Sequence, residues 1–328
     1  MNYQAPWWLP GGHLQTIWAA KLSGIDPGGD ADAARFARER WDTRDGDFID
    51  VDWLADAGGA PLRSTTLLVM FHGLEGSSQS HYSRGFAQAA RARGWALAIP
   101  HFRGCSGELN RAPRAYHSGD HIEIDWILRR LAARHGASVL AVGISLGGNA
   151  LMRWAGEHGA SASQAARAVV SVCSPLDLSA SGAAMGRGFN RQVYTRMFLQ
   201  TMKPKALQKL AQHPGLFDRE RLLAAQDLYE FDNVFTAPLH GFRDTDDYWR
   251  RASAKPHLPS IGIAALAINA LNDPFVPAAS LPRPADVGAS LQLWQPAHGG
   301  HVGFASGRWP GHVMAMPDAV CAWLDAVR

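Results

Sequence analysis

Short apolar runs alternate with amphipathic stretches along most of the chain. In the 122–134 stretch, apolar residues recur three or four positions apart, which is the spacing of a helix with one buried face. Short apolar runs between turn-forming residues are typical of buried strands. The alternation predicts an α/β fold, a mostly parallel central sheet with helices on both faces. Strands are predicted over Thr66–Phe71, Ala96–Pro100, Val139–Val142, Ala168–Cys173, Gly262–Asn269 and Ser290–Trp294, and helices over Tyr82–Arg93, Ile122–Arg134, Gly147–Glu157 and Val313–Val327.

This alternation stops between residues 175 and 259. Large flexible side chains, among them Met185, Phe198 and Phe217, predict a group of helices there. For each side chain alone, the core of an extra helix is the simpler explanation, but together they indicate a cap with an apolar inner wall. No linker-like stretch divides the chain. We therefore expect one domain over residues 1–328, a helical cap inserted at 175–259, and an N-terminal extension, residues 1–60, that packs on the core.

One segment, SVLAVGISLGGNALMRWAGE at residues 138–157, carries a candidate nucleophile. Its apolar run stops at Gly143, and Ser145 then stands between Gly143 and Gly147, directly before a helix-forming stretch. This is the G-x-S-x-G pattern in the strand–turn–helix context of a nucleophile elbow, which exposes the serine hydroxyl. The five-residue pattern alone is also compatible with an ordinary corner between a strand and a helix. The flanking strand and helix favour Ser145 as a nucleophile.

A nucleophilic serine needs a base, and the base needs a carboxylate to orient it. In α/β folds that carry a nucleophile elbow, the carboxylate precedes the histidine in the sequence, and both follow the serine. Asp273 lies in a turn after the apolar 261–269 run, although an aspartate before proline is more often a turn former. The glycine-rich loop after Trp294 carries His298 and His301. We favour His301 because Gly299 and Gly300 let the loop wrap towards the serine, and His298 stays the alternative.

The oxyanion hole is predicted from the loop after the first apolar strand, within TTLLVMFHGLEGSS at residues 65–78. This fold uses the N–H after the nucleophile and a second N–H from such a loop. These rules select the backbone N–H groups of Leu146 and Leu74. His72 is interpreted as a structural histidine that bonds the loop backbone, and no chemistry is assigned to Glu75.

Longer motifs occur along the chain: GGHLQTIW, HGLEGSSQSHYSRG, HFRGCSGELNRAPRAYHSGD, GISLGGNAL, FDNVFTAPLHGF, NDPFVP and GGHVGF. With these motifs the chain resembles the YheT-like branch of the α/β-hydrolases over nearly its whole length. The resemblance implies that Ser145 is the nucleophile, Asp273 the carboxylate and His301 the base. It also implies carboxylesterase-like hydrolysis, because members are described as hydrolases and eukaryotic relatives act on lipid esters or transfer acyl groups. Asn272 stands where members often carry a second aspartate, and Trp249 where tyrosine is more usual.

Composition and charge limit the kinds of partner and the cellular location that we expect for the protein. The 328 residues are 47% hydrophobic and carry a net charge of +3, and no run of five basic residues occurs, which argues against nucleic acid. The three cysteines, Cys105, Cys173 and Cys321, have no metal-like spacing and fit a reducing compartment. The first residues lack the order of a signal peptide, and no apolar run reaches the ~20 residues of a transmembrane helix. We expect a cytoplasmic protein without metal or organic cofactor.

The function predicted from these features is hydrolysis of a small-molecule, hydrophobic carboxylic ester through an acyl-serine intermediate. Acyl transfer to an alcohol would use the same three residues, and an inert ligand-binding protein could share the scaffold. In the loop at residues 103–120, Arg103, Tyr116, His117 and Asp120 can contact substrate or brace the loop by hydrogen bonds, and bracing is favoured. The spacing from His213 to Asp218 resembles an acyltransferase signature but is expected by chance in a chain with 14 histidines.

Overall fold

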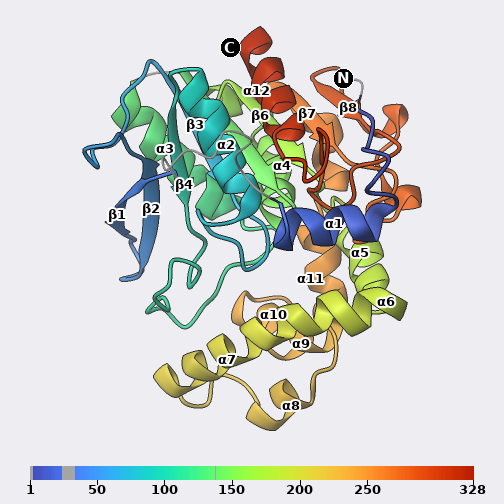
Figure 1. Ribbon diagram of the computed structural model, residues 1–328. Coiled ribbons are helices and arrows are strands. Elements are labelled where there is room, and N and C mark those ends of the chain that lie inside the picture. Colours follow the sequence, from blue (N-terminus) through green and yellow to red (C-terminus); the bar gives the residue numbers. More distant parts are fainter. Residues whose placement is uncertain (1–2, 24–33, 137) are drawn as a thin grey trace.

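A computed structural model describes residues 3–23, 34–136 and 138–328 (Figure 1). Residues 24–33 of the expected N-terminal extension therefore lie outside the described residues. The core is an eight-stranded sheet with strand order β1-β2-β4-β3-β5-β6-β7-β8, in which β3 to β8 are parallel and β2 pairs antiparallel with β1 and β4. The strands are β1 Phe36–Asp42, β2 Phe48–Leu54, β3 Thr66–Phe71, β4 Ala96–Pro100, β5 Ser138–Ile144, β6 Ala168–Val172, β7 Ala264–Ile268 and β8 Leu291–Trp294.

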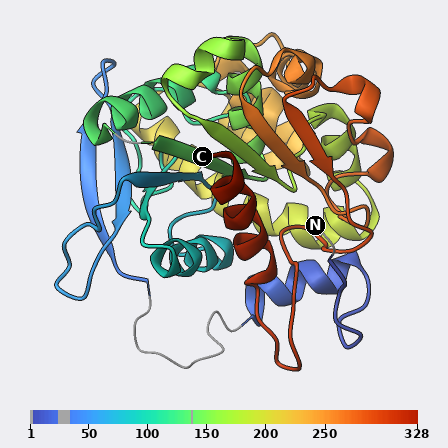
Figure 2. The same ribbon diagram turned by 90° about the horizontal axis from the view of Figure 1, so that it is seen from above.

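Helices cover both faces of this sheet, as the alternating pattern predicts. Side chains of α3 (His121–His135) and α4 (Leu146–His158) pack on one face, and those of α2 (His81–Ala92) and α12 (Ala315–Val327) on the other. Successive residues of β3 point to opposite faces, so that Leu67 and Val69 join the first layer and Leu68 and Met70 the second. Figure 2 shows the sheet between the two helical layers.

The predicted elements agree closely with the structure. All six predicted strands are present, and β3 and β4 begin and end at the predicted residues. The four predicted helices are also present, each within two residues of its predicted start and within one of its predicted end. Strands β1 and β2, which the pattern did not predict, extend the sheet by an antiparallel pair at the β4 edge.

Between β6 and β7 the chain leaves the sheet and forms a group of helices, which we call the helical insertion. It lies below the sheet in Figure 1, beyond the carboxyl ends of the parallel strands. Two apolar clusters hold it together, one around Phe231 and Phe235 and another around Tyr248 and Trp249. Its helices are α5 Leu178–Met185, α6 Gly188–Asn190, α7 Arg196–Gln212, α8 Arg219–Ala224, α9 Leu228–Val234, α10 Thr236–Leu239 and α11 Thr245–Ala252.

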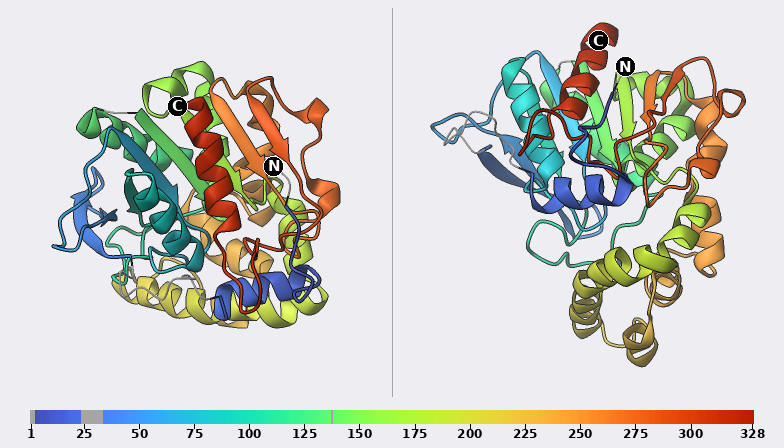
Figure 3. Two further views of the ribbon diagram at one scale, coloured as in Figure 1. Left: turned by 45° about the horizontal axis from the view of Figure 1, so that its top comes forward. Right: turned by 45° about the vertical axis from the view of Figure 1, so that its right-hand side comes forward.

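The N-terminal helix α1 (Gly12–Lys21) lies across the same edge of the sheet, next to the C-terminal loop before α12 (Figure 3). Leu9 and Trp18 are buried against Ala305 and Val313 of that loop. The buried side of α1 also carries two polar residues, Gln15 and Thr16.

Candidate active site

Ser145 lies in a tight turn between β5 and α4 and has a left-handed backbone, with φ of 52°. The turn needs glycine on both sides. A Cβ at Gly143 would lie 2.5 Å from the Gly147 carbonyl oxygen, and one at Gly147 would lie 2.5 Å from the carbonyl oxygens of Phe71 and His72. The Ser145 N–H donates to the Val172 carbonyl at 2.8 Å, which ties the turn to β6. This is the local geometry that the G-x-S-x-G pattern predicts.

The structure brings Ser145, His301 and Asp273 together, although they come from three separate loops. His301 Nε2 lies 3.0 Å from Ser145 Oγ, and His301 Nδ1 lies 2.9 Å from Asp273 Oδ2. The other Asp273 oxygen, Oδ1, accepts the N–H groups of Phe275 and Val276 at 2.8 and 3.3 Å. The Asp273 side chain is fully buried and that of His301 is 11% exposed. The three side chains therefore form a continuous hydrogen-bonded chain from the serine to the buried carboxylate.

Helix α1 holds the loop that carries His301. The Gln15 side-chain oxygen accepts the Gly299 N–H at 2.9 Å, and Thr16 Oγ1 accepts the His301 N–H at 2.8 Å. Asn272 Oδ1 accepts the Gly300 N–H at 2.9 Å, so the residue that departs from the family pattern has a role in the same loop. The alternative histidine, His298, is exposed and has Asn272 Nδ2 at 3.4 Å from its Nδ1.

The loop after β3 lies against Ser145, where the second oxyanion donor was predicted. A Cβ at Gly73 would lie 3.3 Å from the Ser145 Cβ. Neither the Leu74 nor the Leu146 N–H donates to a loop or side-chain acceptor among the described residues. Glu75 has a left-handed backbone with φ of 56°, and its N–H donates to Tyr116 Oη at 3.0 Å. Tyr116 Oη in turn donates to Glu75 Oε1 at 2.9 Å.

His72 sits behind this loop and is fully buried. Its Nε2 accepts the Phe102 N–H at 3.1 Å, so its Nδ1 carries the proton and donates to the Gly73 carbonyl at 2.8 Å. Burial lowers the pKa of His72 to about 3, which keeps the ring neutral. The ring therefore bonds the loop backbone, as the sequence interpretation expected.

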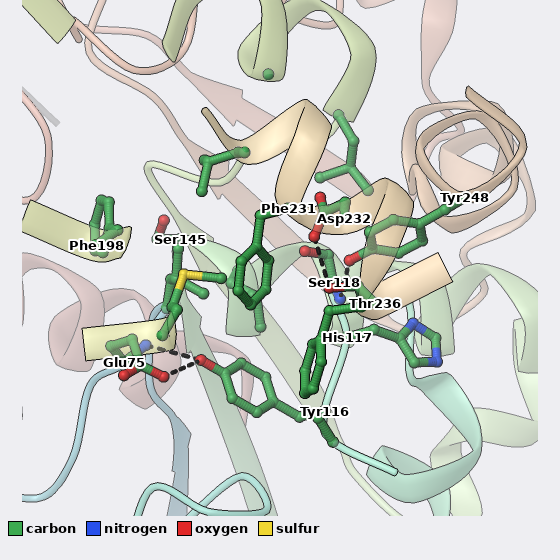
Figure 4. Close-up of a pocket in the computed structure, with 18 of the residues that line it drawn as sticks. Glu75, Tyr116, His117, Ser118, Ser145, Phe198, Phe231, Asp232, Thr236 and Tyr248 are labelled. Carbon is green, nitrogen blue, oxygen red and sulfur yellow. Dashed lines mark hydrogen bonds between the residues drawn. The ribbon is translucent and has the colours of Figure 1, made fainter. Parts of the chain in front are cut away.

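A cavity of about 160 Å³ opens beside Ser145, between the sheet edge and the helical insertion. Most of its wall is apolar, and the insertion supplies Met185, Phe198, Met202, Phe231 and Phe235. In the view of Figure 4, Ser145 and Glu75 lie on one side of the Phe231 ring, and a polar group lies on the other. That polar group consists of His117, Ser118, Asp232, Thr236 and Tyr248.

Asp232 is the buried acid of this polar group. Thr236 Oγ1 donates to one of its oxygens at 2.6 Å, and Trp249 Nε1 donates to the other at 2.8 Å. Burial raises the pKa of Asp232 to about 6, against the effect of both hydrogen bonds. Trp249, which stands where the family more often has tyrosine, thus contributes a hydrogen bond as well as packing.

The 103–120 loop is braced by ion pairs, and three of its four candidate residues also line the cavity. The buried Arg103 guanidinium contacts Asp45 at 2.8 Å and both Asp47 and Glu123 at 2.7 Å. Asp120 pairs with Arg114 and caps α3. Arg103, Tyr116 and His117 line the cavity.

Within residues 3–23, 34–136 and 138–328, no three His, Cys, Asp or Glu side chains are placed to hold a metal ion together. In the same part of the chain, none of the helices is both long and apolar enough to cross a membrane.

Known proteins resemble this chain in sequence and in fold. A family model described as the alpha/beta hydrolase fold matches residues 66–307. "Putative esterase YheT" from Escherichia coli (strain K12) is 39% identical over 289 residues, which cover 87% of this chain and 84% of that protein. Mouse "Phospholipase ABHD3" is 29% identical over 304 residues, 89% of this chain and 70% of that protein.

Among solved structures, the Pyrococcus furiosus esterase Pf2001 superposes with a TM-score of 0.57 and 13% identity, over 93% of this chain and 96% of that chain. At that identity the likeness shows the fold alone. The family match and the YheT similarity each cover most of the chain. The protein therefore belongs to the α/β-hydrolase family, within its YheT-like branch.

Proposed function

We propose that this protein is a serine hydrolase that cleaves carboxylic esters through an acyl-serine intermediate. The observation that carries the proposal is the hydrogen-bonded chain from Ser145 Oγ through the His301 ring to Asp273, at distances of 3.0 and 2.9 Å. A serine hydroxyl is a weak nucleophile until an adjacent base takes its proton, and this geometry supplies the base and its orienting carboxylate.

In the proposed reaction, His301 Nε2 takes the proton of Ser145 as Oγ attacks the ester carbonyl carbon. Asp273 Oδ2 accepts the hydrogen bond from Nδ1–H, which keeps Nε2 free to act as base and then stabilises the imidazolium. The N–H groups of Leu146 and Leu74 face the developing oxyanion, and one such donor lowers a barrier by about 3 kcal/mol in related chemistry. His301 returns the proton to the leaving alcohol. A water molecule activated by His301 then releases the acid and regenerates Ser145.

The cavity supports a hydrophobic substrate. Its wall combines the phenylalanine and methionine side chains of the helical insertion with Ser145 and His301. Such a wall favours an ester with an apolar acyl or alcohol part, because burial of that part drives binding. The names of two relatives, an esterase and a phospholipase, agree with this class of substrate. We further propose that the helical insertion acts as the cap that shapes the pocket.

The test combines active-site labelling with turnover. A fluorophosphonate probe should label the wild-type protein, and p-nitrophenyl esters of increasing acyl length should be hydrolysed with a preference for longer chains. Ser145→Ala should abolish both signals, while Ser174→Ala, at a nearby buried serine outside the hydrogen-bonded chain, should keep both. Full hydrolysis by Ser145→Ala would refute the serine mechanism. Ester rather than acid as the main product in the presence of an added alcohol would instead show acyl transfer.

A further inference from the structure

Exposed apolar side chains gather on one side of the molecule. Eight of the eleven large hydrophobic residues that are strongly exposed belong to four segments: the N-terminal segment with α1, the 188–197 segment of the insertion, the turn after β7, and the loop before α12. We call this surface the apolar face. Its residues are Trp7, Leu14, Leu22, Phe189, Val193, Met197, Leu271 and Trp309.

Direct contacts join the four segments. The His13 ring of α1 lies 4.6 Å from the Phe189 ring of the insertion. The Trp8 ring lies 5.3 Å from the Trp309 ring. Gln15 Oε1 accepts a hydrogen bond from Asn272 Nδ2, next to Leu271, at 3.0 Å. The left view of Figure 3 shows α1 beside the loop before α12 and the first helices of the insertion, so the segments share a side.

The charges of three of these segments, all except the turn after β7, have a single sign. The stretches 3–23, 178–217 and 287–317 contain no aspartate or glutamate, in a chain that carries 29 of them. Exposed arginines lie among the apolar residues, and Arg187, Arg196 and Arg308 make no side-chain hydrogen bond or ion pair within the described part of the chain. The acids that contact these stretches include Asp177, Glu75 and Asp273. The half-buried Asp177 caps α5 by accepting the Ala180 N–H at 3.1 Å, and the side chains of Glu75 and Asp273 are only 10% and 0% exposed.

The apolar face also borders the cavity. The Tyr194 ring lies 5.8 Å from Phe189 on the face and 4.6 Å from Phe275, which lines the cavity. Phe275 in turn lies 4.2 Å from the His301 ring. A row of aromatic rings therefore leads from the apolar face to the candidate catalytic histidine.

We propose that the apolar face docks onto the surface of a lipid bilayer that contains anionic lipids. A large exposed apolar patch marks an interaction site, and apolar residues with cationic neighbours fit a negatively charged lipid surface. Tryptophans such as Trp7 and Trp309 are suited to this depth, because an indole buries its ring and keeps its N–H at the headgroups. Docking in this way places the cavity beside the lipid, and it does not require Ser145 to react.

The test measures sedimentation with vesicles of phosphatidylcholine mixed with phosphatidylglycerol, and with vesicles of phosphatidylcholine alone. Wild type should bind the mixed vesicles and lose binding as salt rises. The double variant Arg187→Gln/Arg196→Gln should bind them at least ~10-fold more weakly, because each basic residue near such a surface contributes about a fivefold factor. Phe189→Ser/Trp309→Ser should weaken binding to a similar extent.

Matched controls lie elsewhere on the surface. Ile122, another strongly exposed apolar residue, is replaced in Ile122→Ser, and the double variant Arg44→Gln/Arg63→Gln removes two exposed arginines. Both should bind vesicles like wild type, and all variants should keep the wild-type melting temperature and hydrolysis of a short soluble ester.

Three results would overturn the proposal: no vesicle binding by wild type, equal binding by the face variants and the controls, or binding of duplex DNA or an acidic protein in place of vesicles. Ser145→Ala should bind vesicles normally. Failure of the proposed ester hydrolysis is thus separable from failure of docking.

Discussion

Replacing Asp273 by asparagine should leave the fold intact and reverse the hydrogen-bonding roles of His301. Asp273 Oδ1 accepts two backbone N–H groups, from Phe275 and Val276, and only an oxygen can take that position. The asparagine amide oxygen is therefore held on the Oδ1 side, and its NH₂ group faces His301 Nδ1, 2.9 Å away in the wild-type protein. Nδ1 must then accept a hydrogen bond, so the ring proton moves to Nε2.

A proton on Nε2 removes the base from Ser145. The hydroxyl can then only accept a hydrogen bond from the ring, and deprotonation needs the rare opposite tautomer. The same substitution in serine proteases lowers kcat by ~10⁴-fold, which corresponds to about 5.4 kcal/mol of activation free energy. We expect a loss of that order here, with KM changed far less, because the Asp273 side chain is fully buried.

Steady-state hydrolysis of p-nitrophenyl butyrate gives kcat and KM, and the rate of fluorophosphonate labelling gives an independent measure of serine reactivity. Both should fall together. Asp286→Asn, on an exposed turn of the same domain, is the matched control and should behave like wild type. If Asp273→Asn folds with the wild-type melting temperature and retains more than ~10% of kcat, the assigned role of the carboxylate is wrong.

Three further substitutions test the surroundings of the site. Tyr116→Phe removes the hydroxyl that accepts the Glu75 N–H, next to the proposed oxyanion donor Leu74. Because the position of that donor depends on the loop, kcat should fall ~10-fold at nearly constant KM. An unchanged kcat would show that the loop holds its shape without this bond. The buried Lys209 ammonium donates to the backbone carbonyls of Asn110 and Ala112, and Lys209→Met leaves both carbonyls without this donor. The free energy of unfolding should fall by about 1–3 kcal/mol, and an unaltered urea midpoint would contradict this. Burial raises the pKa of Asp232 to about 6, so the stability that its protonated form contributes is fully present below pH 3.8 and is lost as pH rises through 6. The urea midpoint of Asp232→Asn should therefore rise relative to that of wild type between pH 4 and pH 7. A difference between the two midpoints that does not change with pH would refute this assignment.

The parallel part of the sheet was predictable because its strands are buried on both faces and read as apolar runs. The antiparallel pair at the edge was not, because β2 places Asp50 and Asp52 in the interior. Each carboxylate is paired with an arginine of β1: Arg40 holds Asp50 at 2.8 Å, and Arg38 holds Asp52 at 2.7 and 2.9 Å. Acidic residues at alternating positions indicate an exposed segment unless the arginines of the partner strand are known. The hydrophobicity of a single sequence therefore does not reveal the β1–β2 strand pair.

The candidate site was likewise predictable only in part. Ser145, Asp273 and His301 could be selected because each follows a recognisable apolar strand in an order typical of the fold. The contribution of α1 could not be predicted, because Gln15 and Thr16 bond to a loop more than 280 positions away. The GGHLQT motif stood out only through its resemblance to the family, and its side chains acquire a role only once the His301 loop is in place.

Backbone conformation adds a further constraint that no residue pattern showed. Five non-glycine residues among those described have a left-handed backbone, and all five lie in loops that follow β3, β5, β6 or β8: Glu75, Ser145, Cys173, Val302 and Phe304. Each such residue costs about 1–3 kcal/mol and persists only where its surroundings fix it. Here the fixing bonds run between the loops, since the Val302 N–H contacts Cys173 Sγ at 3.3 Å and the Ser145 N–H reaches β6 at 2.8 Å. The loops therefore hold one another in unfavourable conformations at the edge where Ser145 and His301 meet, and this arrangement supports the proposal of a preorganised site there.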